Sequence, residues 1–364
     1  METPYIEPIE GKDFFNILLW MPNWIGDVIL VLPTVQSLSR SFPNSRISLI
    51  LKAPSHELLV GHPAVDSIFK VPYGPDSGFF EQIRFARRLK KYHFDLGIVF
   101  SNSFRSALLL YLSGVKTRLG YDTDGRIMFL THPSKGSPRS KTQHRVKYFF
   151  GVLEPLGLEG PDTKFESFIP LSLDKSLKAE FDRLRPDTQD LFIALHPGGS
   201  KFPRRWHSER YGVLCQKLIK EYSAKVLIIG GPEDEEIANG IESTCPQNSV
   251  LKLTSLNLQQ TAAAMRQCSL FIGNDSGMMH LAAMMGIPVV GIFGPGNALT
   301  TEPYIEEEKR AIVTKSFFCS PCRQNFFKEC KPSPHNKPYC IEDISVKDVE
   351  EAVCKLISSG VVKM

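Results

Sequence analysis

Short apolar runs, separated by stretches with helical character, are the feature that most constrains the fold of this 364-residue chain. The runs are rich in Val, Ile and Leu and lack the polar alternation of half-exposed strands. Strands of this kind, joined by helices, form parallel sheets that are covered on both faces. The pattern therefore predicts an α/β protein with one doubly wound sheet in each half, with strands at 16–22, 46–51, 67–72, 95–100, 191–198, 225–231, 270–275 and 288–294.

The length of the chain favours two domains over a single core. We expect them to join within 168–190, where a Pro-bearing strand runs into an amphipathic helix, and we set the domains at 1–178 and 179–364. A C-terminal helix that packs back on the first domain is an alternative. Two such Rossmann-like domains that face each other leave a cleft at the carboxyl ends of both sheets, where open α/β sheets bind ligands.

Charge is unevenly distributed along the chain. Residues 1–150 hold 19 Lys and Arg against 12 Asp and Glu, whereas the remainder holds 24 against 27. The basic half indicates an anionic partner or membrane face, and a merely solvated surface explains it equally well. No apolar run approaches the roughly 20 residues of a membrane span, and the N-terminus lacks the pattern of a signal peptide. We expect a cytoplasmic protein.

The first predicted strand ends in MPNWIGD, which places a carboxylate at the carboxyl end of a strand. Gly26 allows close approach of the backbone, and Asp27 follows at the start of a helix. Asp27 either caps that helix or acts as a general base in the cleft. Asn23 and Gly26 are candidates on the acceptor side. Pro33 predicts a kink or a broken first turn in the helix.

The second half opens with HPGGSKFPRRWHSERY, which combines glycines with basic residues. Gly199 and Ser200 follow a strand and can present N–H groups and a hydroxyl to an anion. Lys201, Arg204 and Arg205 come next, and several fixed cations suit a pyrophosphate without a metal ion. The spacing is not that of a Walker loop.

A second acidic site follows the next strand, in IIGGPEDEE. Glu233 can reach the cleft, where a carboxylate accepts hydrogen bonds from ribose hydroxyls. For the residues Asp234–Glu236, a solvated acidic helix start is the better interpretation.

The stretch NDSGMMHLAAMMG joins a buried strand to a short helix. Ser276, Gly277 and the first helical N–H groups predict an anion site that the helix dipole assists. Asp275 is placed to accept from sugar hydroxyls. His280 lies one turn into the helix on the face of Ser276, where a phosphate or ribose contact competes with a role in the core.

Two patterns allow a role for metal. DTDG at 122–125 matches the D-x-D of metal-dependent transferases, although Asp and Gly form a turn equally well. Four cysteines follow the pattern C-x2-C-x7-C-x9-C, and in a reducing compartment zinc is the sharper hypothesis for them. They are Cys319, Cys322, Cys330 and Cys340. The spacing is irregular for a zinc ribbon.

Four of these motifs in their order resemble the bacterial lipopolysaccharide heptosyltransferases of glycosyltransferase family 9. They are PNWIGD, HPGG…RRWHSERY, IIGGPEDE and NDSGMMHLAAMMGIPVVGIFGP, and RLGYDTDGR and HRVKYF also look like family segments. The resemblance spans roughly residues 15 to 350. It implies a GT-B fold, with the acceptor mainly on the N-terminal domain and the nucleotide-sugar mainly on the C-terminal one.

The resemblance also implies an inverting, metal-independent transfer of heptose from ADP-heptose to the lipopolysaccharide inner core, a Kdo/heptose–lipid A acceptor, with no cofactor. By position, Asp27 matches the family's base and Glu233 its ribose-binding acid. Asp275, Ser276, Gly277 and His280 match the donor signature D-[ST]-G-x-x-H. Arg204 falls where relatives usually have a lysine on the pyrophosphate, so the charge is kept while the geometry changes.

Other functions remain open at this point. The same fold could use another nucleotide-sugar, or the chain could be a zinc-stabilised nucleotide-sugar-binding protein without catalysis, against which the presence of Asp27 argues. We expect no nucleic-acid partner, and a peripheral contact with the cytoplasmic face of the inner membrane is a further expectation.

Overall fold

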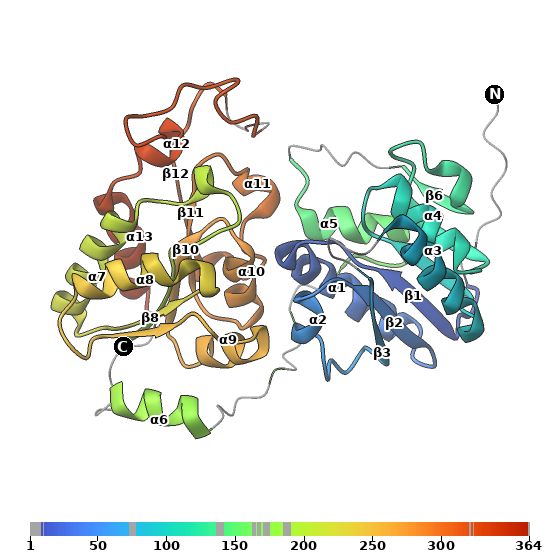
Figure 1. Cartoon of the computed structure of the whole chain (residues 1–364), viewed down its shortest axis with the longest axis horizontal. Helices are drawn as coiled ribbons and strands as arrows, with labels where there is room; N and C mark the ends of the chain where they lie inside the picture. Colours follow the sequence, from blue (N-terminus) through green and yellow to red (C-terminus); the bar gives the residue numbers. More distant parts are fainter. Residues whose placement is uncertain are drawn as a thin grey trace. The chain divides into compact units, whose positions relative to one another are not determined.

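The chain divides into two compact units, Met1–Phe168 and Ile169–Met364 (Figure 1). A computed structural model describes residues 9, 11–72, 78–135, 142–161, 165, 169, 175–184, 191–319, 322 and 324–362. The division falls at the start of the predicted join, before residue 178.

The first unit holds a six-stranded parallel sheet in the order β3-β2-β1-β4-β5-β6. Its strands are β1 (Asn16–Trp20), β2 (Arg46–Leu51), β3 (Ser67–Lys70), β4 (Leu96–Val99), β5 (Thr117–Tyr121) and β6 (His132–Ser134). Its helices are α1 (Ile25–Ser41), α2 (Ser55–Leu58), α3 (Phe79–Arg88), η1 (Leu89–Tyr92), α4 (Phe104–Leu112), η2 (Ile127–Phe129), α5 (Arg145–Phe150) and η3 (Gly151–Leu156).

The second unit repeats this arrangement with the order β12-β11-β10-β7-β8-β9, again parallel throughout. Its strands are β7 (Phe192–His196), β8 (Lys225–Ile229), β9 (Val250–Leu253), β10 (Leu270–Asn274), β11 (Val289–Phe293) and β12 (Arg310–Thr314). Its helices are α6 (Lys175–Leu184), η4 (Phe202–Arg204), α7 (Ser208–Tyr222), η5 (Pro232–Asp234), α8 (Glu235–Ser243), α9 (Leu258–Met265), α10 (Gly277–Met284), α11 (Ala298–Thr301), η6 (Glu307–Lys309), α12 (Tyr339–Glu342) and α13 (Val346–Ser358). The predicted α/β class with two doubly wound sheets is confirmed.

In both sheets the order of the strands reverses at the centre, between β1 and β4 in the first unit and between β7 and β10 in the second. Loops that leave the carboxyl ends of such neighbours diverge to opposite faces of the sheet and leave a crevice for a ligand. The motifs PNWIGD, HPGGS and NDSG lie directly after β1, β7 and β10. The fold therefore puts PNWIGD in the first unit, and HPGGS and NDSG in the second, at the place in each sheet where ligands bind.

The sheets lack polar alternation because both of their faces are buried. In the second unit, Ile193, Leu195 and Ile272 pack on one face against side chains of α7, α8 and α13. Phe192 and Phe271, which point the other way, are also fully buried. Burial of such side chains is worth about 1.5–3 kcal/mol each.

Helix α1 runs without a break through Pro33, so the expected broken first turn is wrong. Proline removes one i→i−4 hydrogen bond, but residues 28–38 of α1 are all buried. Ser37 Oγ also donates a hydrogen bond of 2.9 Å to the Pro33 carbonyl. Tertiary packing thus holds the helix together where local propensity is poor.

The C-terminal helix α13 packs against β12, β11 and α7. These elements all belong to the second unit. Val349, Val353 and Leu356 carry the contact and are almost fully buried. In the part of the chain that the structure describes, no helix is long and apolar enough to cross a bilayer.

Candidate active site

Asp27 lies in the first turn of α1, directly after β1. The residue in the N-cap position is Trp24, so the interpretation of Asp27 as the helix cap is wrong. The Asp27 carboxylate faces a cation instead: Arg145 Nη2 lies 3.4 Å from Asp27 Oδ1, and each side chain is 24% exposed. Asn23 is exposed and Gly26 half-buried on the same β1–α1 turn. A carboxylate that is accessible to a ligand can act as a general base.

Arg145 is held in place by aromatic rings at the start of α5. Its guanidinium lies 4.9 Å from the ring centre of Tyr148 and 4.8 Å from that of Phe149. The Tyr148 hydroxyl accepts a hydrogen bond of 2.6 Å from Asn102 Nδ2, in the loop after β4. Tyr121, at the end of β5, stacks on Tyr148 and donates to its carbonyl oxygen at 2.5 Å. The segments RLGYDTDGR and HRVKYF therefore meet behind Asp27.

The DTDG sequence forms a turn that seats a buried arginine. Asp124 and Gly125 both have left-handed backbone, with φ of 54° and 66°. Arg126 follows, is fully buried, and donates to the carbonyl oxygens of Tyr121 and Ser101 and to Asn102 Oδ1. Burial lowers the pKa of Arg126, while the carboxylates of Asp122 and Asp124 act to raise it. The turn interpretation of DTDG explains the sequence without a metal ion.

In the second unit, Asn274 fixes the loop that follows β7. This residue ends β10, is fully buried, and uses both ends of its amide group. Its Nδ2 donates to the carbonyl oxygens of Pro197 and Gly198, both at 2.9 Å. Its Oδ1 accepts from the Trp206 N–H at 2.9 Å and from the Tyr211 hydroxyl at 3.0 Å. Three of these hydrogen bonds set the course of the HPGGSKFPRRW loop, and the fourth ties Asn274 to α7.

Arg204 and Asp275 form an ion pair that joins this loop to the end of β10. Arg204 Nη1 lies 3.1 Å from Asp275 Oδ2, with the arginine 25% and the aspartate 5% exposed. Arg204 Nη2 donates to Gln324 Oε1 at 2.8 Å. Arg204 therefore makes two directed contacts, which an ammonium group could not reproduce in the same geometry.

A second ion pair lies between the loop and β8. Arg205 Nη1 is 3.9 Å from Asp234 Oδ1, and Arg205 Nε donates to the Gly199 carbonyl at 2.7 Å. Asp234 is 2% exposed, so the interpretation of this residue as part of a solvated helix start is wrong. Its Oδ2 accepts from the Gly231 N–H at 3.3 Å. A Cβ on Gly230 would lie 2.7 Å from Asp234 Oδ2, which explains why glycine precedes this acid.

Glu233 is exposed beside the buried Asp234. Its carboxylate folds back over Gly231, where any Cβ would overlap it. Ser200 is likewise exposed, and Gly199 has φ of 150°, a conformation that side chains rarely adopt. These residues remain open to a ligand.

Ser276 is the N-cap residue of α10, and Gly277 is the first residue of the helix. Its side chain makes no capping hydrogen bond, and its Oγ is buried without a hydrogen-bond partner among the described residues. His280 lies in the same helix and is 5% exposed. The first N–H groups of a helix have no partner within it and carry part of its positive dipole. The Ser276 hydroxyl and the start of α10 thus offer donors beside the Arg204–Asp275 pair.

His207, His335 and Glu342 bring their ligand atoms within 4.8 Å of one another. Glu342 accepts from His207 Nε2 at 2.9 Å and from Ser333 Oγ at 2.8 Å, and its Oε1 is 3.0 Å from His335 Nδ1. Arg210 Nη2 lies 3.2 Å from the same carboxylate. A carboxylate that already faces a guanidinium is a poor metal ligand, and we interpret this cluster as a link between α7 and α12.

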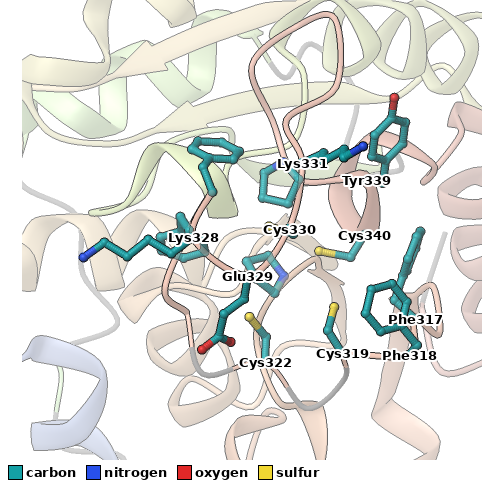
Figure 2. A pocket seen from close by; sticks show the side chains of 14 residues that line it. Phe317, Phe318, Cys319, Cys322, Lys328, Glu329, Cys330, Lys331, Tyr339 and Cys340 are labelled. Carbon is teal, nitrogen blue, oxygen red and sulfur yellow. The ribbon is translucent and has the colours of Figure 1, made fainter.

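The four cysteines of the C-x2-C pattern gather around one cavity of about 620 Å³. Figure 2 shows the sulfur atoms of Cys319, Cys322 and Cys340 turned toward the same space. Burial and the neighbouring thiols raise the pKa of Cys340 to about 12. Among the described residues, however, no three of these sulfur atoms lie within 4.8 Å of one another.

Several contact residues escaped sequence reasoning. Asn274 lies in the motif NDSG, and its position next to Asp275 at a strand end could have marked it as a contact residue. Arg145 and Asn102 act through contacts to residues more than 40 positions away, which no local pattern reveals. Lys337 was equally hidden: its Nζ donates to the Arg205 carbonyl at 2.7 Å, and burial lowers its pKa to about 8.

Comparison with known proteins identifies the family. The model of glycosyltransferase family 9 (heptosyltransferase) matches residues 82–331. The lipooligosaccharide heptosyltransferase 2 of Campylobacter jejuni is 25% identical over 348 residues, which cover 94% of this chain and 99% of that protein. The lipopolysaccharide heptosyltransferase 2 of Salmonella typhimurium is 27% identical over 307 residues, which cover 79% and 85%.

The fold agrees with this result. The solved structure of E. coli ADP-heptose lps heptosyltransferase II has a TM-score of 0.75 at 20% identity, and the match covers 95% of this chain and 100% of that one. The expected GT-B architecture is thereby confirmed, as is the resemblance that the motifs indicated. The chain belongs to glycosyltransferase family 9, the heptosyltransferases.

Proposed function

We propose that this glycosyltransferase moves a heptose from ADP-heptose to the inner core of lipopolysaccharide, with inversion at the anomeric carbon and without a catalytic metal ion. The names of the relatives support heptose transfer and the acceptor class, and the name of the E. coli structural neighbour supports ADP-heptose as the donor. The observation that carries the proposal is the ion pair between Arg204, in the loop after β7, and Asp275, directly after β10. It lies beside the buried Ser276 hydroxyl, which has no hydrogen-bond partner among the described residues.

The second unit would bind the donor. The pyrophosphate carries the charge that Arg204 and Arg205 are placed to meet, together with N–H groups at Gly199 and at the start of α10. Glu233 is exposed and would accept from the ribose hydroxyls, and Asp275 from hydroxyls of the sugar. Ser276 and His280 complete the donor set by their position in the signature. As ADP leaves, these fixed donors stabilise the charge that develops on it.

The first unit would bind the acceptor and supply the base. Asp27 takes the proton of the acceptor hydroxyl while that oxygen attacks the anomeric carbon, and the bond from this carbon to the β-phosphate oxygen breaks. The transition state has oxocarbenium character, as in other glycosyl transfers. Arg145 Nη2, 3.4 Å from Asp27 Oδ1, would keep the carboxylate oriented. Asn23 and Gly26 line the same turn on the acceptor side.

Helix α3 is the surface that suits an anionic lipid acceptor or the membrane that holds it. Arg84, Arg87 and Arg88 line a hollow of about 400 Å³ together with Phe80 and Ile83. Phe80 is 83% exposed, an unusual position for a large apolar side chain unless it meets another apolar surface. Arginines around an exposed ring fit a lipid headgroup and the start of its acyl chains.

A panel of nucleotide-sugars tests the donor. Stabilisation by RT ln(1 + [L]/Kd) means that the true donor gives the largest rise in Tm at equal concentration. We expect ADP-heptose to exceed ADP-glucose, GDP-mannose and UDP-N-acetylglucosamine, and to yield ADP and a heptosylated product with heptose-deficient lipopolysaccharide. A larger rise with another nucleotide-sugar, which is then consumed, would instead support a transferase of the same fold with a different donor.

A further inference from the structure

The segment between β12 and α12, residues 315–338, carries chemistry that the transfer reaction does not use. It places three cysteines, Cys319, Cys322 and Cys330, around the cavity whose wall Cys340 of α12 completes (Figure 2). Its described residues form turns and bends rather than a helix or a strand. The other four cysteines of the chain lie elsewhere, so the four thiols at this one cavity need an explanation of their own.

The backbone next to Cys322 has the form of a thiolate-binding turn. The Gln324 N–H donates to Cys322 Sγ at 3.1 Å, and Gln324 has a left-handed φ of 61°. An N–H group directed at sulfur stabilises a thiolate ligand over a neutral thiol. Lys328 and Lys331 line the same cavity, where they offset part of the negative charge of four thiolates around a divalent ion.

We propose that Cys319, Cys322, Cys330 and Cys340 bind one thiophilic divalent metal ion, Zn²⁺ or Fe²⁺, in a tetrahedral thiolate site. Four thiolates are the ligand set that such ions prefer, and the C-x2-C pair supplies two of them from a single turn. With metal–sulfur bonds of about 2.3 Å, the sulfur atoms would be separated by about 3.8 Å. Because no three of the described sulfur atoms lie within 4.8 Å of one another, binding would draw the cysteines closer together around the ion.

The metal site would hold the donor-binding loop in position, an inference that rests on the proposed function. Gln324, two residues after Cys322, accepts from Arg204 Nη2 at 2.8 Å. Lys337, three residues before Cys340, donates to the Arg205 carbonyl at 2.7 Å and lies 4.0 Å from the ring centre of Phe202. An ion that fixes the cysteines fixes both contacts, and through them the two arginines proposed for the pyrophosphate.

Metal content of the full chain is the direct test. Protein purified without a metal-affinity step should hold about one equivalent of zinc or iron by mass spectrometry of the elements, and the element found separates the two ions. Cys322→Ser and Cys340→Ser should each lose it. Cys354→Ser is the matched control, since Cys354 lies in α13, contacts Tyr222 at 3.3 Å and is no part of the cavity. It should keep the metal.

A second measurement covers the case in which a variant fails to fold. Wild-type protein loaded with Co²⁺ should show the near-ultraviolet charge-transfer absorption of cobalt–thiolate bonds. Less than about a tenth of an equivalent of metal in protein whose eight cysteines titrate as free thiols would overturn the proposal. Disulfide bonds between the four cysteines, found by mass mapping of protein prepared anaerobically, would overturn it as well.

The link to the donor loop is tested by calorimetry with ADP. Folded, metal-free Cys322→Ser should bind ADP about 2- to 10-fold more weakly, the range expected for loss of one directed hydrogen bond. An unchanged Kd would refute the positioning role while the metal content still decides the site. Absence of ADP binding in the metal-loaded wild type would count against the proposed function and not against the metal.

Discussion

Replacement of Arg204 by methionine is the sharpest test of the donor site. Methionine keeps the length and much of the apolar stem of arginine while removing its charge and its donors. In the structure this side chain links Asp275 at 3.1 Å with Gln324 at 2.8 Å, beside the buried Ser276 hydroxyl. If Arg204 meets the pyrophosphate, its loss must weaken the binding of ADP itself, whatever the sugar.

The size of the effect follows from the contacts. A hydrogen bond to a charged group is worth about 1.5–3 kcal/mol, which corresponds to a rise in Kd of roughly 10- to 150-fold. Arg204→Met also leaves Asp275, only 5% exposed, without its cation and next to the incoming phosphates. Asp275→Asn should therefore have opposite effects on ADP binding in the wild type and in the Arg204→Met variant. It weakens ADP binding in the wild type, where Asp275 orients Arg204, and it strengthens binding in the Arg204→Met background, where the carboxylate only repels.

Calorimetric titration of ADP into the wild type, the two single variants and the double variant measures this cycle. Arg310→Met is a matched control, because Arg310 pairs with Glu302 at 3.0 Å and is 23% exposed, close to the 25% of Arg204. It should leave the Kd for ADP unchanged. A Kd within twofold of wild type for Arg204→Met, in protein with an unchanged Tm, would refute the assignment of Arg204 to the pyrophosphate.

Four further outcomes are expected. Asp27→Ala should lower kcat about 10²- to 10⁴-fold and leave the Kd for ADP intact, and turnover near that of the wild type would remove Asp27 from the mechanism. EDTA should not abolish transfer, whereas a loss that Mn²⁺ or Mg²⁺ restores would indicate a metal-dependent reaction. Neutralising the basic run Arg84–Lys91 should raise the KM for the lipid acceptor, more so as salt is lowered, and a weaker donor Kd instead would reverse the roles of the units. Asn274→Ala should lower the free energy of unfolding in urea by about 3–5 kcal/mol, because it leaves buried backbone groups without a hydrogen-bond partner. An unchanged midpoint would contradict this.

Most strands that sequence reasoning found are buried on both faces, and the exception is the edge strand β3, whose residues are exposed or half-buried. All eight predicted runs contain a strand, among them the central β1, β4, β7 and β10. Four strands were missed: β5, β6, β9 and β12. Three of these lie at sheet edges, where one side of the strand is open and residues such as Lys252 and Arg310 break the apolar run. Pattern alone cannot separate such strands from loops.

The site was predictable where its residues lie at the ends of central strands. Asp27 follows β1 in the first unit, Asp275 follows β10 in the second, and Arg204 lies in the loop after β7. Each parallel sheet brings the carboxyl ends of its own strands to one edge, so residues that follow them stand out. The contacts that hold them in place were not predictable. Arg145 reaches Asp27 from 118 positions away, and Gln324 reaches Arg204 from 120. Distances of this kind along the chain follow from the packing of whole elements, which local propensity does not encode.

Under the proposed function, the ion pairs would allow the donor site to work without a metal ion. A bare cluster of guanidinium groups would repel itself and would have to reorganise around the ligand. Here each cation is paired before the donor arrives, Arg204 with Asp275 and Arg205 with Asp234, and both acids are nearly buried. The acids fix the direction of the guanidinium groups, which each keep N–H donors for a second acceptor. A pyrophosphate can therefore bind to donors that are already oriented, and the charge that develops on departing ADP meets a field that needs no rearrangement.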